Sequence, residues 1–360
     1  MARLENHPLG LFAICVVFSG AAAIGHSAQS PGAVAPETPL VGACHVSPIV
    51  ENLDRSARFY HDLVGLDLVP AAPLRPTDLK AGEPLPWDTD PGHLHLHGLP
   101  QARLRFIGAR MPGVRCGVEL VEFVDVERKA VHRRIQDPGA ATLILLVRDI
   151  DTAFAPLKKA GVHVVTTGGG PISMSTANKT RAVIVQDPDG HFVELVQVDP
   201  LPETSVTASS NIIGIRLRVT VADVERTAAY YEKVLGVQWP TRPFVANRNV
   251  MAMTGLPDAG EYRLVMAQLP GSALTLEFIQ FRGLDSARVP APSHVQDPGS
   301  FRLQLTFRDI DATLGALSRA GSHVISTGGV PVRMTFGNRP WRLAVVPDPN
   351  NLFLIVQQGP

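Results

Sequence analysis

The stretch IQDPGAATLILLVRDIDTAFAPLKKAGVHVVTTGGGPISM, residues 135–174, decides the fold because it occurs twice. Residues 295–334, VQDPGSFRLQLTFRDIDATLGALSRAGSHVISTGGVPVRM, align with it without a gap at an offset of 160. A second pair, HVSPIVENLDRSARFYHDLVGL (45–66) and RLRVTVADVERTAAYYEKVLGV (216–237), aligns at an offset of 171. The chain is therefore an internal duplication, in which about 43–199 and 211–358 are copies of each other.

Each half contains two weakly related units. A β-rich run meets an Asp or Asn helix cap, continues with apolar residues at helical spacing and stops at Gly65 or Gly161. Short strand signals divided by Pro and Gly follow, among them LRFIGA, GVELVEFV, RAVIVQ and HFVELVQV. One strand, one helix and about three strands, repeated four times, predict an α+β fold. Such a sheet has one bare face to bury, so we expect two units to enclose a half-barrel.

Length and composition indicate a globular protein of two domains. The chain has 360 residues, of which 45% are hydrophobic, enough for a sizeable core in each domain. Lys+Arg and Asp+Glu both number 33, and no Lys/Arg-rich run appears. Because the net charge is zero and basic residues are not clustered, we expect no nucleic-acid partner and no stable membrane partner.

The N-terminus is typical of a secretory signal peptide. Arg3 precedes an apolar run over about 9–25, then small residues and a Pro/Ala/Ser-rich stretch. We predict a signal peptide over 1–28 and a linker over 29–42, hence an exported protein, periplasmic or secreted; an uncleaved membrane anchor is the alternative. Cys44 and Cys116 then either pair or stay as buried thiols.

Four phrases in order resemble the vicinal oxygen chelate superfamily, the βαβββ proteins that include glyoxalase I, extradiol dioxygenases and the bleomycin resistance proteins. They are HVSPIVENLDRSARFYHDLVGLDLV, GVELVEF, VRDIDTAFAPLKKAG and DPDGHFVELVQ. The resemblance covers nearly the whole chain after residue 40. It implies two tandem half-barrel domains of two units each, over 43–200 and 208–360, and leaves open a homodimer.

The resemblance also implies where metal ligands belong. Metal-dependent relatives supply one ligand from the first strand of each unit and one Glu from its last strand. Carried over in chain order, these positions hold His45, Glu119, Thr142 and Glu194 in the first half and Arg216, Glu277, Arg302 and Ile355 in the second. The second half thus lacks a usual ligand set.

A metal site in the first half is the leading functional expectation. His45, Glu119 and Glu194 would hold a divalent ion, Fe, Mn, Zn or Ni, which chelates adjacent oxygens of a small-molecule substrate. Glu194 or Glu119 would be the catalytic base of a lyase, isomerase or dioxygenase. Thr142, which stands where a His is common, argues against it.

The competing interpretation is a metal-free protein that sequesters a small molecule, as the bleomycin resistance members do. In it, Glu119 and Glu194 pair with arginines and His45 is a strand-edge histidine. Arg216 and Arg302 either neutralise Glu277 or hold an anionic compound.

Two further motifs have structural interpretations. HLHLHGLP places His93, His95 and His97 on one face if the segment is extended. We interpret it as a loop or edge strand. The alternatives are that the three imidazoles assist or replace the primary metal site, or bind Cu or Ni adventitiously. TTGGGPISM and STGGVPVRM lack a following Lys-Ser/Thr and a helix start, so we expect turns between strands.

Overall fold

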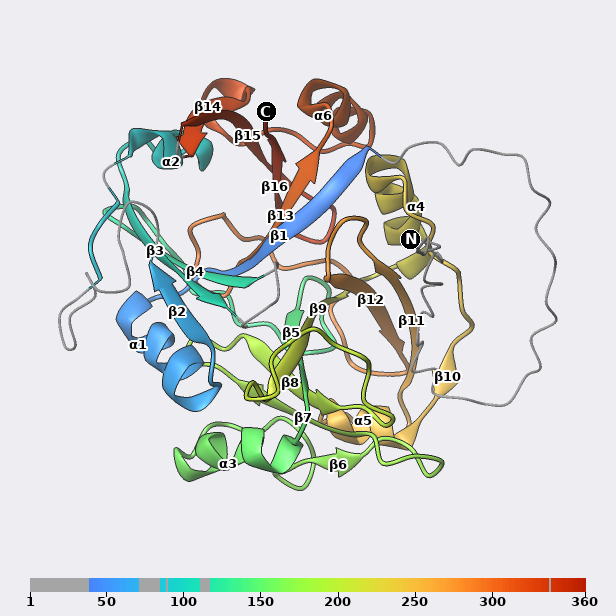
Figure 1. The fold of residues 1–360 in the computed structure, drawn as a ribbon. Coiled ribbons are helices and arrows are strands. Elements are labelled where there is room, and N and C mark those ends of the chain that lie inside the picture. Colours follow the sequence, from blue (N-terminus) through green and yellow to red (C-terminus); the bar gives the residue numbers. More distant parts are fainter. Residues whose placement is uncertain (1–38, 71–84, 89, 111–116, 337) are drawn as a thin grey trace, which may run out of the picture.

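Two eight-stranded sheets make up the protein (Figure 1). The computed structural model describes residues 39–360 except 71–84, 89, 111–116 and 337. The expected signal peptide, most of the linker and Cys116 lie outside the described residues, as does the side chain of Cys44. The predicted α+β fold of four βαβββ units in two half-barrels is confirmed.

Sheet A has the strand order β14-β15-β16-β13-β1-β4-β3-β2 and sheet B the order β10-β11-β12-β9-β5-β8-β7-β6. The strands of sheet A are β1 (Leu40–Pro48), β2 (Asp67–Pro70), β3 (Arg103–Arg110), β4 (Gly117–Val124), β13 (Phe301–Phe307), β14 (Val332–Phe336), β15 (Arg339–Pro347) and β16 (Leu352–Gln358). Those of sheet B are β5 (Ala141–Val147), β6 (Ile172–Ser173), β7 (Arg181–Gln186), β8 (Phe192–Gln197), β9 (Ile212–Thr220), β10 (Val245–Ala246), β11 (Glu261–Gln268) and β12 (Thr275–Arg282).

The units pair across the duplication, and here the expectation from sequence is wrong. We name the units 1 (β1–β4), 2 (β5–β8), 3 (β9–β12) and 4 (β13–β16). Unit 1 joins unit 4 through antiparallel β1 and β13, with Val46 opposite Leu303. Unit 2 joins unit 3 through antiparallel β5 and β9, with Leu143 opposite Leu217. Each half-barrel therefore contains one unit from each half of the sequence.

Four helices follow the first strands of the units, as predicted, and begin at the expected caps. They are α1 (Leu53–Arg58), extended by the π-helical turn η1 (Phe59–Leu63), α3 (Ile150–Lys159), α4 (Val224–Leu235) and α6 (Ile310–Arg319). Asn52, Asp149, Asp223 and Asp309 accept hydrogen bonds from backbone N–H groups of the first turns. One apolar core holds residues of all four helices and of both sheets, among them Leu53, Leu157, Tyr231 and Leu317.

Two short helices that were not predicted from the sequence lie on the other faces of the sheets. Helix α2 (Pro91–Leu96) contacts β14 and β15, and α5 (Arg248–Met253) contacts β6 and β7 (Figure 1). The Gly-rich phrases form turns, as expected, but each leads from a helix to a strand: the first lies between α3 and β6, and the second, with a 3-10 turn, η3 (Thr327–Gly329), lies between α6 and β14. Within the described residues, no helix combines the length and apolar character needed to cross a membrane.

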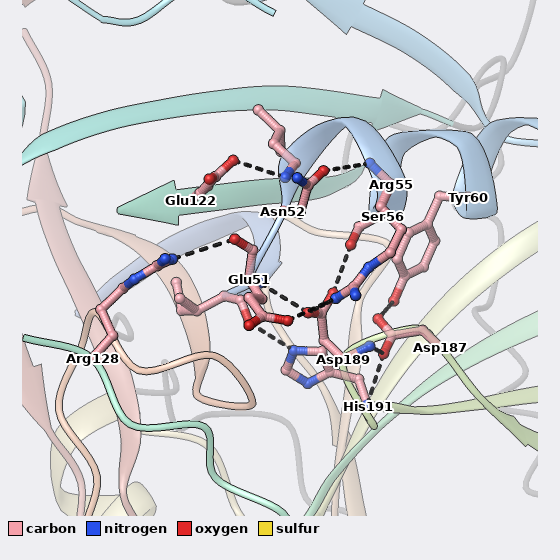
Figure 2. A network of polar contacts seen from close by, with 12 residues as sticks. Glu51, Asn52, Arg55, Ser56, Tyr60, Glu122, Arg128, Asp187, Asp189 and His191 are labelled. Atoms are coloured by element: carbon pink, nitrogen blue, oxygen red, sulfur yellow. Dashed lines mark hydrogen bonds and ion pairs between the residues drawn. The ribbon is translucent and has the colours of Figure 1, made fainter. Parts of the chain in front are cut away.

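A buried polar network ties unit 2 of sheet B to unit 1 of sheet A (Figure 2). Asp189, in the turn between β7 and β8, accepts hydrogen bonds from Ser56 Oγ at 2.6 Å and Arg55 Nη2 at 2.7 Å. Asp187 accepts one from the Tyr60 hydroxyl at 3.0 Å. The phrase DPDGH therefore fastens α1 to the neighbouring half-barrel.

The corresponding turn of unit 4 fastens unit 3 in the same way. Asp348 accepts a hydrogen bond from the Tyr231 hydroxyl at 2.9 Å, and Asn350 Nδ2 donates to Thr227 Oγ1 at 3.4 Å. Burial raises the pKa of both Asp187 and Asp348. The two half-barrels are thus joined by two related buried contacts as well as by the shared core.

Candidate functional site

The polar residues of the predicted site lie on the sheet faces opposite the four helices. On β9, Leu217 and Val219 enter the helix-covered core, so Arg216 and Arg218 point to the opposite face. On β1, Val46 does the same, which turns His45 and Ser47 to the inner face of sheet A. Strand alternation therefore builds one polar cluster on each inner face.

In sheet B, Arg218 is the centre of an ion-pair network. Its Nη1 donates to Glu194 Oε2 at 2.6 Å and its Nε donates to Glu277 Oε2 at 2.9 Å. Arg216 Nη1 donates to Glu277 Oε1 at 3.3 Å. Because Glu194 and Glu277 are buried, their charges need these partners.

The surroundings of this network are apolar and shift two pKa values. Burial raises the pKa of Glu194, and the charge of Arg218 opposes the shift. Burial likewise raises the pKa of Tyr262, again opposed by Arg218, so its phenol stays protonated. Thr142 is buried on the adjacent strand, where it is the register partner of Arg218.

On the inner face of sheet A, the polar cluster of the described residues pairs Arg302 with Glu119. Arg302 Nη2 donates to Glu119 Oε2 at 2.9 Å, and Ser47 Oγ donates to the same oxygen at 3.4 Å. His45 Nδ1 lies 3.0 Å from Gln304 Oε1, and Gln304 Nε2 donates to Gln357 Oε1 at 2.6 Å. Since the Gln304 oxygen then accepts, the proton of this imidazole lies on Nδ1.

The structure does not bring the three predicted metal ligands together. His45 and Glu119 are in sheet A, whereas Glu194 is in sheet B. The expectation failed because it assigned units 1 and 2 to one half-barrel. Regrouped, the four family positions are His45, Glu119, Arg302 and Ile355 in sheet A and Thr142, Glu194, Arg216 and Glu277 in sheet B.

Neither set fits a divalent ion. In sheet A two of the four positions are Arg302 and Ile355, and Glu119 is bound to a guanidinium. In sheet B both carboxylates are bridged by Arg218, a cation that a metal would have to displace. Within the described residues there is no group of three His, Cys, Asp or Glu side chains suited to a metal.

The expected role of the two arginines is correct for one and wrong for the other. Arg216 pairs with Glu277, as expected, but Arg302 pairs with Glu119. The central residue Arg218 was missed, although it stands two positions after Arg216 and therefore on the same strand face. Gln304 was missed because polar, uncharged residues do not stand out in a sequence.

His93 and His95 lie in helix α2 and His97 follows it directly, so the interpretation of this segment as loop or edge strand is wrong. Asp90 caps α2 and Pro91 occupies its first turn, a helix-start signal in the sequence. His95 is exposed, while His97 is buried against Phe123 and accepts a hydrogen bond from Arg302. One of the three histidines thus belongs to the cluster of sheet A.

Comparison with known proteins agrees with this architecture. Residues 43–195 match the family model described as Glyoxalase/Bleomycin resistance protein/Dioxygenase superfamily. The resemblance predicted from the sequence is confirmed. The other half of the chain is related to the matched half by the internal duplication.

Individual relatives are distant. A lactoylglutathione lyase of Oryza sativa is 27% identical over 121 residues, which are 33% of this chain and 38% of the rice protein. Glyoxalase I from Zea mays superposes with a TM-score of 0.52 at 16% identity, covering 89% of this chain and 92% of the maize chain. A putative dioxygenase from Bacillus subtilis gives 0.50 at 13% identity, covering 89% and 86%. At such identities the likeness extends to the fold alone.

Proposed function

We propose that this vicinal oxygen chelate protein binds a small anionic molecule without a metal, on the inner face of sheet B. The supporting observation is that Arg216 and Arg218, both on β9, differ in how many of their N–H donors are bonded to carboxylates. Arg218 donates to both Glu194 and Glu277. Among the described residues, Arg216 makes one polar contact, to Glu277 at 3.3 Å, and its side chain is 19% exposed. A guanidinium has five N–H donors, so Arg216 retains donors for an anion.

The neighbours of Arg216 suggest an apolar body for that anion. Ile144 is its register partner on β5, and Ile144 belongs to an apolar cluster on this face with Ile279, Tyr262 and Met253. A carboxylate or sulfonate on an aromatic or aliphatic frame combines the two requirements. The Tyr262 hydroxyl, protonated at neutral pH, is a further donor for a ligand oxygen.

This proposal replaces the metal-dependent enzyme that the sequence favoured. A lyase, isomerase or dioxygenase chelating adjacent substrate oxygens needs open metal positions, and arginines hold the carboxylates at those positions in both sheets. The alternative kept open by the sequence, a metal-free binding protein, therefore has the better support.

The test uses 8-anilino-1-naphthalenesulfonate, a fluorescent anion with an apolar body, titrated into the full chain. We expect saturable binding that Arg216→Gln weakens about ten- to hundredfold, the scale of one or two charge-assisted hydrogen bonds. Arg242→Gln, an exposed arginine before β10, is the matched control and leaves binding unchanged.

Two outcomes contradict the proposal. Equal binding by the wild type and Arg216→Gln places the probe elsewhere. Stoichiometric Fe, Mn, Zn or Ni in the purified protein, lost in His45→Ala or Glu194→Gln, restores the metal-dependent enzyme.

Export stays a prediction, since residues 1–28 lie outside the described part of the chain. The N-terminal residue of the mature protein from its native host tests it. A soluble cytoplasmic product that retains Met1 contradicts it.

A further inference from the structure

Helices α2 and α5 are equivalent elements of units 1 and 3, held to their sheets by the same contacts. Ser326 Oγ donates to the carbonyl oxygen of Leu96 at 2.6 Å. Thr166 Oγ1 donates in the same way to Met253 at 2.8 Å. One residue follows each helix before a glycine, and these two residues differ: His97 after α2 and Thr254 after α5.

The hydroxyl of Thr254 forms its hydrogen bonds within helix α5, whereas the side chain of His97 contacts Arg302 in the buried polar cluster of sheet A. The Thr254 hydroxyl donates to the Val250 carbonyl oxygen at 2.8 Å. The His97 ring lies edge-on to Phe123, with centroids 5.1 Å apart, and its Nδ1 donates to the His93 carbonyl oxygen at 2.7 Å.

The remaining nitrogen of His97 determines its charge. Its Nε2 contacts Nη1 of Arg302, and a guanidinium can only donate. The imidazole must therefore accept at Nε2, which only its neutral form with the proton on Nδ1 can do. Burial, reinforced by Arg302, lowers the pKa of His97 well below its ordinary value.

Beside the cation Arg302, the described residues provide no further carboxylate that could pair with a protonated His97. Arg302 on β13 is buried, and among the described residues its Nε has no hydrogen-bond partner and its one carboxylate is Glu119 on β4. His93 on the same helix pairs with Asp88. Strands β14 and β15 present the apolar residues Met334 and Leu343 to the helix.

Protonation of His97 thus removes its acceptor and places two cations in contact at a buried site. The cost of such an uncompensated charge is relieved when α2 leaves the sheet and carries His97 into water. Departure of α2 also uncovers Arg302 and Glu119.

We propose that α2 is a proton-sensitive latch over Arg302, closed while His97 accepts its hydrogen bond and released when His97 is protonated, whereas α5 has no such response. The proposal concerns sheet A and is independent of the ligand site proposed on sheet B.

Hydrogen–deuterium exchange of the full chain between about pH 5 and pH 7.5, corrected for intrinsic rates, tests it with α5 as an internal reference. Below about pH 6.5, the opening of α2 should increase by up to tenfold per pH unit, the limit for uptake of one proton. The opening of α5 should not increase. Equal pH responses of the two helices would overturn the proposal, and this comparison needs no variant.

Substitutions identify the sensor. His97→Gln retains an acceptor for Arg302 and cannot be protonated, so the pH response of α2 should disappear. His95→Gln, exposed on the same helix, should keep it. A response that survives His97→Gln but is lost in His93→Gln assigns the effect to the His93–Asp88 pair and overturns the proposal.

Discussion

At the scale of single residues, Arg218 performs the neutralisation that the superfamily resemblance assigned to a metal. Its guanidinium donates to two buried carboxylates from different strands, Glu194 on β8 and Glu277 on β12. A planar group with divergent N–H bonds can join two such acceptors, which the single ammonium charge of a lysine does less well. The network is a structural centre, and the ligand contact proposed for Arg216 lies beside it.

Replacing this guanidinium should be costly. Arg218→Met leaves both carboxylates buried and unpaired, so we expect the free energy of unfolding at neutral pH to fall by about 3–5 kcal/mol. In the variant the folded state favours protonated carboxyls, which raises their folded pKa above the unfolded value. The loss should therefore become smaller as the pH falls toward about 5, and urea denaturation at both pH values measures this.

Arg226→Met is the matched control, because Arg226 is exposed on α4. Its effect should stay within about 0.5 kcal/mol. An equally small loss for Arg218→Met would show that the carboxylates are already protonated or solvated.

At the scale of elements, helices α2 and α5 pack on their sheets through close contact between backbone atoms. Both helices end on a left-handed glycine, Gly98 with φ 69° and Gly255 with φ 67°. A Cβ on Gly98 would lie 2.3 Å from the carbonyl oxygen of Ile325, and one on Gly255 would lie 2.4 Å from that of Val165. The helices seat closely because neither position carries a side chain.

Alanine substitutions at these glycines, compared with one at Gly161, separate the cost of a left-handed backbone conformation from the cost of a steric clash with a neighbouring carbonyl oxygen. At Gly161, with φ 68°, a Cβ would meet no atom of the described residues within 4 Å, so Gly161→Ala should cost only the roughly 1–2 kcal/mol of a left-handed alanine. Gly98→Ala and Gly255→Ala should each cost clearly more, by thermal or urea denaturation. Equal losses for the three variants would mean that α2 and α5 shift without cost.

The sequence predicts the long elements better than the short ones. Helical periodicity and Asx caps identified the four helices, and β-rich runs identified the first and last strands of each unit. Helices α2 and α5 have six residues each, too few for a periodic signal, although Asp90-Pro91 marked one start. Candidate residues were found by position, but their grouping depends on which sheet edges pair, and duplicated units carry nearly the same edge pattern.

At the scale of the whole molecule, the duplicated halves are interlaced. Each half of the chain contributes one unit to each sheet, and Tyr60 and Tyr231 bond to buried aspartates of the neighbouring half-barrel. Because each half of the chain contributes strands to both sheets, a substitution in either half can alter the inner face of either sheet.

The two tyrosine contacts should contribute comparably and independently. Tyr60→Phe and Tyr231→Phe each remove one hydrogen bond from a buried carboxylate, for an expected loss of about 1–3 kcal/mol. The double variant should lose the sum within about 0.5 kcal/mol, because the sites share no partner. Urea denaturation of the four proteins measures this, and a strongly non-additive double variant would indicate that one contact supports the other.

Cutting the chain tests the interlacing directly. Fragments 39–205 and 206–360 each contain two units whose sheet partners are in the other fragment. We expect neither to be a folded monomer alone, and we expect the two, when co-expressed, to elute as a 1:1 complex on size exclusion. Two separately folded monomers would show that units within a half can pair with each other.

The strand order also determines which sheet can form first while the chain is synthesised on the ribosome. Units 2 and 3 are consecutive, so sheet B can close while the chain is still growing. His45 and its partner Gln304 are 259 residues apart, and the first strand must wait for β13 to emerge. Contacts this distant in sequence form late and leave strand edges exposed meanwhile. The half-barrel that holds His45 and Arg302 is therefore the last part of the molecule to be completed, and the part most dependent on protection during biosynthesis.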